Sequence, residues 1–181
     1  MHLPTPGLPH TASGLVVQLR DGSEIYIRPI TPADAAGLIE FHGRLSPESI
    51  RLRFFSPHPR LSSAEVDRFT NVDHTKRDAL VAVHDDTIVG VGRYEGSAGS
   101  AEAEVAFVVA DAWHHRGVAT ALLREVAAHA RAAGLRRLVA DTLAENHPMI
   151  DVFEHSGLPL VRTYDGSTIH YSMSLVDAAA T

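Results

Sequence analysis

Short runs rich in β-branched and other apolar residues recur along the chain and predict strands joined by tight turns. The first two runs, 15–19 and 24–28, flank Asp21-Gly22, a pair typical of a hairpin turn. Further strands are predicted at residues 79–84, 87–94, 102–110, 136–142, 160–163 and 168–174. The pattern therefore predicts a protein built around a sheet.

Helix signals separate these runs. Thr31-Pro32, Ser46-Pro47 and Ser62-Ser63 each place a capping hydroxyl before a helical pattern, which predicts three helices after the first hairpin. A longer helix is predicted over 117–133, where apolar residues recur at helical spacing up to Gly134. Another helix is predicted over 146–156, so the second half of the chain reads strand, helix, strand, helix, strand.

The chain length predicts one domain. With 181 residues and 45% hydrophobic content, the chain can bury a single core. We expect the domain to span residues 15–176, with a flexible tail rich in Pro, Gly, Ser and Thr at 1–14 and a frayed end at 177–181.

Composition excludes several classes of function. A net charge of −6 disfavours nucleic acid or an anionic membrane as partner, and no apolar run is long enough to span a membrane. The absence of cysteine excludes disulfides, a thiolate nucleophile and cysteine-ligated zinc. The twelve histidines form no H-x-x-x-H or H-E-x-x-H motif, so we expect no metal site. The chain is expected to be cytoplasmic.

The most informative stretch is 104–120, an apolar strand that turns through a small loop into the long helix. The first turn of a helix leaves backbone N–H groups unpaired, and these attract phosphate oxygens together with the helix dipole. Gly117 and Ala119 keep the turn small. We therefore expect the N–H groups of Gly117, Val118, Ala119 and Thr120 to hold a diphosphate.

The same loop carries a family resemblance. His114-His115-Arg116-Gly117-Val118-Ala119 resembles motif A of the GNAT N-acetyltransferases, Q/R-x-x-G-x-G/A, which binds the pyrophosphate of acetyl-CoA. His114 stands where that family usually has Gln or Arg. A second motif, N-x-x-A-x-x-x-Y-x-K-x-G-F, reads here as Asn146-His-Pro-Met149-Ile-Asp-Val-Phe153-Glu-His155-Ser-Gly157-Leu158.

The resemblance implies the GNAT fold over about residues 15–176. This is an α/β (α+β) fold with a mixed, mostly antiparallel sheet of six to seven strands flanked by helices. It also implies that the fourth and fifth strands, here 102–110 and 136–142, splay apart to admit the co-substrate acetyl-CoA.

The resemblance further implies the residues that hold acetyl-CoA. The backbone of Phe107 and Val109 would pair with the pantetheine arm, which Asn146 would also touch. The Val109 N–H would polarise the thioester carbonyl. The remaining contacts would come from the loop, at His114, His115, Arg116, Gly117, Val118, Ala119 and Thr120.

A carboxylate is the candidate base. Glu102 and Glu104 lie on one face of their strand by two-residue alternation, and Glu104 is deeper among apolar neighbours. The GNAT resemblance implies that a glutamate on this strand removes the proton from the amine, so we predict that Glu104 is catalytic. Phe153 replaces the tyrosine that often protonates the thiolate, which leaves water, Tyr164, Tyr171 or His155 as the proton source.

Three segments of the N-terminal half indicate the acceptor. Ile27-Arg-Pro-Ile-Thr-Pro-Ala-Asp34, Arg51-Leu-Arg-Phe-Phe-Ser56 and Val72-Asp73 resemble the Pat-type protein-lysine acetyltransferases, whose usual targets are acyl-CoA synthetases. Residues 51–60 and 73–77 would then line the acceptor side. Two alternatives stay open: an acetyltransferase for a small amine, and a catalytically silent module that binds acyl-CoA.

Overall fold

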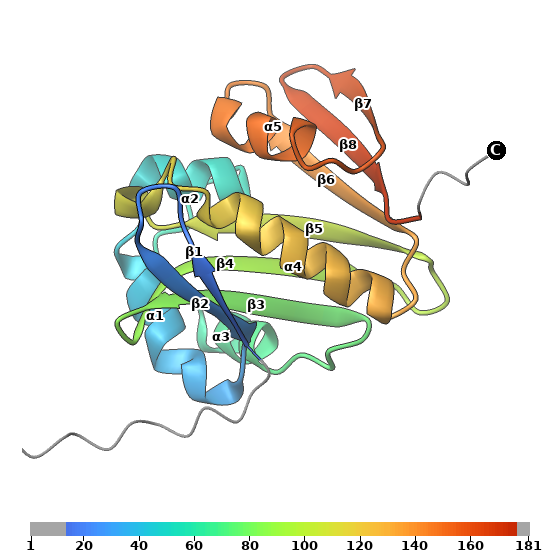
Figure 1. Cartoon of the computed structure of the whole chain (residues 1–181). Helices are drawn as coiled ribbons and strands as arrows, with labels where there is room; N and C mark the ends of the chain where they lie inside the picture. Colours follow the sequence, from blue (N-terminus) through green and yellow to red (C-terminus); the bar gives the residue numbers. More distant parts are fainter. Residues whose placement is uncertain (1–13, 177–181) are drawn as a thin grey trace, which may run out of the picture.

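The protein is described by a computed structural model, which covers residues 14–176. One sheet of eight strands runs through it in the order β1-β2-β3-β4-β5-β6-β8-β7 (Figure 1). The strands are β1 (Leu15–Gln18), β2 (Glu24–Pro29), β3 (Arg77–His84), β4 (Thr87–Gly96), β5 (Glu102–Val109), β6 (Arg137–Leu143), β7 (Leu160–Asp165) and β8 (Thr168–Ser174).

The predicted fold is confirmed, with one difference in the number of strands. All strand pairs are antiparallel except β5 with β6, as expected for a mixed, mostly antiparallel sheet. The sheet has eight strands instead of six to seven, because the terminal hairpins β1–β2 and β7–β8 both join it.

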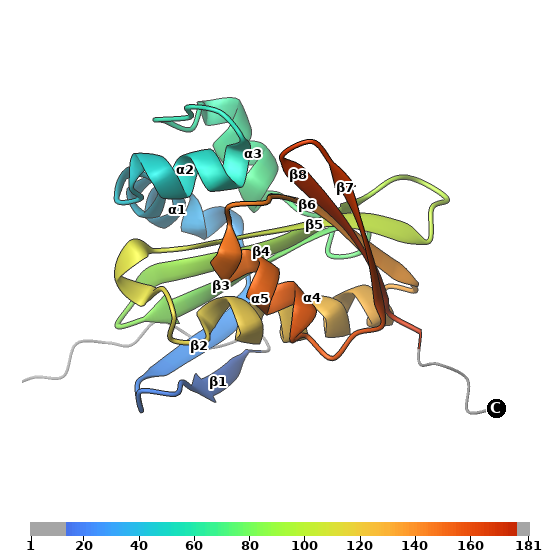
Figure 2. The ribbon, with the colours of Figure 1, turned by 90° about the horizontal axis from the view of Figure 1, so that it is seen from above.

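Helices cover both faces of the sheet. They are α1 (Ala35–Gly43), α2 (Pro47–Phe54), α3 (Ser63–Thr70), α4 (Val118–Ala132) and α5 (His147–Glu154), with short 3-10 turns η1 (Pro32–Asp34) and η2 (Asp111–Trp113). Figure 2 shows α1, α2 and α3 on one side of the sheet and α4 and α5 on the other. No helix within residues 14–176 is long and apolar enough to cross a membrane.

The predicted helix starts are formed by local hydrogen bonds. The Ser46 hydroxyl accepts from the Ser49 N–H at 3.1 Å before α2. Ser62 and Glu65 form a reciprocal capping box before α3. Asn146 caps α5 by accepting from the Met149 N–H. These side chains satisfy backbone groups that helix ends leave unpaired, which is why the sequence signals were informative.

Each face of the sheet has its own apolar core, and two glycines bring α4 close to β4. A Cβ built on Gly92 would lie 2.8 Å from the Phe107 ring and 3.2 Å from Val126, and one on Gly90 would lie 3.0 Å from Val118. Because the first of these contacts is shorter than real Cβ atoms show and the other two are unusually tight, these glycines allow the helix to pack closely on the sheet.

The pairing between β5 and β6 is short. It includes only Glu102 with Arg137, Ala103 with Leu138 and Glu104 with Val139, after which the two strands diverge. β5 stays paired with β4 from Ala103 to Val109, and β6 stays paired with β8. The predicted splay is therefore confirmed, and it begins at Glu104.

The predicted tails, 1–14 and 177–181, lie outside the described residues except for Gly14. The predicted domain bounds, 15–176, accordingly stay a prediction.

The close packing under α4 leads to a stability test. Gly92→Ala should destabilise the fold by about 1–3 kcal/mol, because its Cβ would overpack the core against Phe107. Gly43→Ala is the matched control, since nothing lies within 4 Å of a Cβ there. Thermal unfolding should give a melting temperature lower by roughly 2–10 °C for Gly92→Ala alone. Equal melting temperatures for both variants would contradict this packing argument.

Candidate functional site

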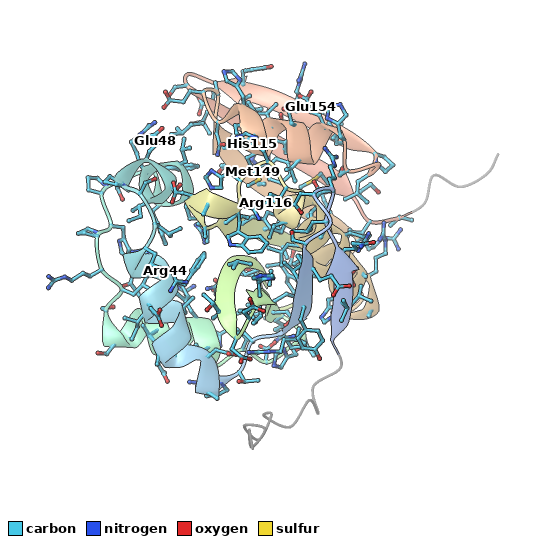
Figure 3. All side chains as sticks on the ribbon, turned by 60° about the vertical axis from the view of Figure 1, so that its left-hand side comes forward. Arg44, Glu48, His115, Arg116, Met149 and Glu154 are labelled. Atoms are coloured by element: carbon cyan, nitrogen blue, oxygen red, sulfur yellow. The ribbon has the colours of Figure 1, made fainter. Side chains whose placement is uncertain are left out.

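A cleft of about 940 Å³ opens where β5 and β6 diverge. It is bounded by β5 from Glu104 to Val109, by the loop that leads into α4, by α2 and by α5. Figure 3 looks at this end of the molecule, with His115, Arg116 and Met149 between Glu48 of α2 and Glu154 of α5. Ten of the eleven predicted site residues line this cleft, namely Glu104, Phe107, Val109, His114, His115, Gly117, Val118, Ala119, Thr120 and Asn146.

The backbone of β5 faces the cleft as predicted. The Ala110 N–H donates to the Val89 oxygen beside β4 at 2.9 Å. Because successive N–H groups of a strand point to opposite sides, those of Val109 and Phe107 point away from β4 and into the gap. Beyond Glu104 this side of β5 has no partner strand among residues 14–176. An extended molecule could therefore pair with it as an added strand.

The loop before α4 presents its N–H groups to the cleft. His115 and Gly117 both have positive φ angles, 60° and 98°, which turn the chain sharply into the helix. The first turn of α4 contains no acidic residue, and its N–H groups border the cleft at Val118, Ala119 and Thr120. This combination suits an anion, since unpaired N–H groups and the positive end of the helix dipole coincide there.

His114 positions the loop. Its Nε2–H donates to the Val109 oxygen at 2.9 Å, so the imidazole ties the loop to the end of β5. Asp111 ties the same loop to α2 by accepting from the Ser46 hydroxyl at 2.6 Å and the Ser49 hydroxyl at 2.9 Å. Burial raises the pKa of Asp111, but these hydrogen bonds outweigh burial and lower it overall.

Arg116 is the predicted site residue that does not line the cleft. Its guanidinium lies 3.3 Å from the Asp21 carboxylate and stacks over the Trp113 ring at 4.6 Å. The side chain therefore joins the β1–β2 turn to η2. Sequence spacing could not reveal this partner, because Asp21 lies far away in the chain.

Glu104 borders the cleft on the face of β5 shared with Ala106 and Val108. Glu95 of β4 lies directly opposite it, and two carboxylates in such a pair repel each other. Each has an arginine nearby: Arg68 bonds to Glu95, and Arg53 of α2 attracts Glu104. Sequence reasoning missed Glu95, since only the strand register brings it to Glu104, whereas Arg53 lies in the predicted acceptor segment 51–60. Glu102 is paired with Arg137 instead and lies outside the cleft.

The structure distinguishes between the residues that were candidates to protonate the CoA thiolate. Phe153 lines the cleft and is only 2% exposed, packed between Phe107 and Tyr171. The Tyr171 hydroxyl donates to Glu154, and burial followed by this hydrogen bond raises the pKa of Tyr171. Tyr164 and Tyr171 do not line the cleft, whereas His155 does. Of these three candidate proton donors, His155 is therefore the one that lines the cleft.

A second, smaller cavity of about 40 Å³ adjoins the cleft behind β5. Arg53, Phe54, Ala106 and Val108 line both spaces. Of the predicted acceptor segments, 51–60 contributes to these walls through α2, but 73–77 contributes to neither.

The chain is similar in sequence to known acetyltransferases. Residues 24–159 match the family model described as the acetyltransferase (GNAT) domain. The acetyltransferase PA5475 of Pseudomonas aeruginosa is 31% identical over 157 residues, which cover 84% of each chain. The acetyltransferase Pat of Mycolicibacterium smegmatis is 27% identical over 149 residues, which cover 81% of this chain but only 44% of that protein.

Solved structures share the fold. The GNAT domain of S. lividans Pat is 40% identical with a TM-score of 0.84, covering 89% of this chain and 96% of that one. The structure of yncA from Salmonella typhimurium, which contains its cofactor acetyl-CoA, has a TM-score of 0.68 at 17% identity and covers 86% and 96%.

Proposed function

The chain belongs to the GNAT acetyltransferase family, and we propose that it transfers an acetyl group from acetyl-CoA to the ε-amine of a protein lysine. The observation that carries the proposal is the unpaired edge of β5, which leads from the anion-binding start of α4 to Glu104. The lysine acceptor is supported by the 40% identity to the GNAT domain of S. lividans Pat. An acyl-CoA synthetase is the proposed target, and the cytoplasm is the proposed location.

Acetyl-CoA would bind in an extended form along β5. Its pyrophosphate would accept hydrogen bonds from the N–H groups of Gly117 to Thr120, at the positive end of the α4 dipole. The pantetheine amides would pair with the backbone of Phe107 and Val109, and Asn146 would contact the same arm from α5. The thioester would then lie between the Val109 N–H and Glu104.

The reaction would proceed by direct attack of the amine. Glu104 accepts a proton from the ammonium, and the amine nitrogen then attacks the thioester carbon. The Val109 N–H donates to the carbonyl oxygen as negative charge develops on it. The carbon–sulfur bond breaks, the attacking nitrogen loses its second proton to solvent, and the thiolate takes a proton from His155 or from water.

A small amine is the second candidate acceptor. The observation that favours it is the small cavity behind Ala106 and Val108, which an extended protein segment in the cleft would leave unfilled. A third possibility is a silent module that binds acyl-CoA without turnover, since His114 and Phe153 depart from the family motifs. The assay described next can exclude it.

The base can be tested by Glu104→Gln. We expect kcat to fall by about 10²–10⁴-fold while the dissociation constant of acetyl-CoA is unchanged, since only proton removal is lost. Glu102→Gln is the matched control, because it removes a carboxylate from the same strand outside the cleft. Thiol release should be measured with an acyl-CoA synthetase and with a panel of small amines.

The acceptors that react in this assay decide between the hypotheses. Release with the synthetase supports the lysine proposal, and release with a small amine alone supports the second candidate. Acetyl-CoA binding without any turnover indicates the silent module. Full activity of Glu104→Gln would contradict its role as the base.

The anion-binding loop can be tested by Gly117→Ala. The φ of 98° strains any side chain by about 1–3 kcal/mol, so the loop should shift and acetyl-CoA should bind roughly 5–100-fold more weakly. Gly99→Ala is the matched control, with a φ of 76° and open space around its Cβ in the β4–β5 loop. Isothermal titration of acetyl-CoA gives both constants, and equal affinities would contradict the assigned loop.

The proton donor can be tested by His155→Gln. Because a CoA thiolate is a good leaving group, we expect kcat to fall by less than about 10²-fold. His147→Gln is the matched control, since His147 begins α5, which His155 follows, and lies outside the cleft. Thiol release measures both variants, and an unchanged kcat of His155→Gln would leave water as the proton source.

A further inference from the structure

The side chain of Arg93 in β4 is buried, and part of its guanidinium has no hydrogen-bonding partner. Arg93 is only 8% exposed, and its Nη2 atom has no partner among the residues that the structure describes. The guanidinium stacks over the Phe69 ring at 4.2 Å, which covers one face of the group without accepting from its N–H groups in their plane. Burying N–H donors without acceptors is costly, so such a group indicates that a ligand supplies the acceptors.

The surroundings of Arg93 are positively charged. Arg53, Arg68 and Arg77 are among the groups that act on it most strongly, and Glu95, the carboxylate among them, is already bonded to Arg68. Burial first, and the neighbouring Arg53 second, lower the pKa of Arg93 to about 10, so it stays charged at neutral pH. This excess of arginines stands out in a chain whose net charge is −6.

The cavity in front of Arg93 is small and otherwise apolar. Its volume of about 40 Å³ is enough for a small group such as a carboxylate head, with the chain that carries it extending toward the cleft. Apart from Arg53, Arg93 and His42, it is lined by apolar side chains, namely Ile30, Leu38, Phe41, Phe54, Leu61, Phe69, Val91, Ala106 and Val108. A guanidinium at the end of an apolar cavity is suited to a carboxylate, which it can bind with two parallel hydrogen bonds.

Strand register places this cavity beside the proposed reaction. Arg93 of β4 lies directly opposite Ala106 of β5. Ala106 is two residues from Glu104 and therefore lies on the same face of β5. Diagonal neighbours on adjacent strands lie within reach of long side chains, at about 7–8 Å. Arg53, Ala106 and Val108 line both the cavity and the cleft. A group that projects from the reacting carbon or from the amine would therefore enter the cavity.

We propose that the cavity lined by Arg53 and Arg93 binds a carboxylate that a short aliphatic chain links to the reacting centre. This inference rests on the proposed function, since it takes Glu104 to mark the reacting centre. The carboxylate has two possible sources, the far end of the transferred acyl group, as in succinyl-CoA, or the carboxylate of an amino-acid acceptor. The reaction is the same in both cases: the nitrogen–carbon bond forms, the carbon–sulfur bond breaks, and Glu104 takes the amine proton.

Two pairs of probes distinguish the sources. Succinyl-CoA is compared with butyryl-CoA, which has the same chain length without the charge. Single amino acids are compared with the amines that lack their α-carboxylate, in the presence of CoA. We expect binding by isothermal titration to favour the charged member of one pair by roughly ten- to a hundredfold, the effect of hydrogen bonds to a charged group. The pair that shows this preference identifies the source.

Substitutions of arginine test whether the preference for the charged probe arises in the cavity. Arg93→Met should abolish it, while Arg124→Met, which removes an exposed arginine of α4, should retain it. Acetyl-CoA binding and thermal unfolding are measured for Arg93→Met to check that its fold is intact. Arg93→Lys should keep part of the preference for the carboxylate. The inference is overturned if neither pair is discriminated by the wild type, or if the preference survives in Arg93→Met.

Failure of this inference is separable from failure of the proposed function. Acetyl transfer that depends on Glu104 without any preference for a carboxylate would remove the carboxylate site alone. A preference that depends on Arg93 without turnover would keep the carboxylate site and remove the proposed catalysis.

Discussion

The structure depends on the point at which β5 and β6 stop pairing. Three residues of β5, from Glu102 to Glu104, pair with β6, and the remaining five keep β4 as their partner. An unpaired strand edge exposes backbone donors and acceptors that need other partners. Here that edge lies inside a cleft, with the start of α4 at one end and the Glu104 carboxylate at the other. The candidate site is therefore built on the part of the sheet that the described chain, residues 14–176, leaves without a partner strand.

The packing on either side of β5 holds this gap open. On one face, Gly90 and Gly92 let α4 approach the sheet closely, which fixes the start of α4 relative to the end of β5. On the other face, Asp111 binds Ser46 and Ser49 and ties the loop to α2. His114 adds a bond from the loop to Val109. Rigid support of this kind reduces the entropy lost when an extended ligand binds.

Charge is unevenly balanced on the face of β4 and β5 that α1–α3 cover. Arg68 bonds to Glu95, and Arg53 attracts Glu104, which offsets part of the repulsion between these two cross-strand carboxylates. Arg93 stacks on the Phe69 ring, and its Nη2 atom has no hydrogen-bonding partner within residues 14–176. A buried positive charge therefore lies beside the wall that the small cavity and the cleft share.

The sequence by itself determined the order of strands and helices, the caps at Ser46, Ser62 and Asn146, and the loop at Gly117, because each depends on residues a few positions apart. It also led to Glu104 through two-residue alternation along one strand. Only the tertiary structure decided that Arg116 binds Asp21, that His155 borders the cleft where Tyr171 does not, and that Arg93 lies beside Ala106. These outcomes depend on strand register and on where neighbouring strands diverge. Both are set by contacts between distant parts of the chain, which no local pattern records.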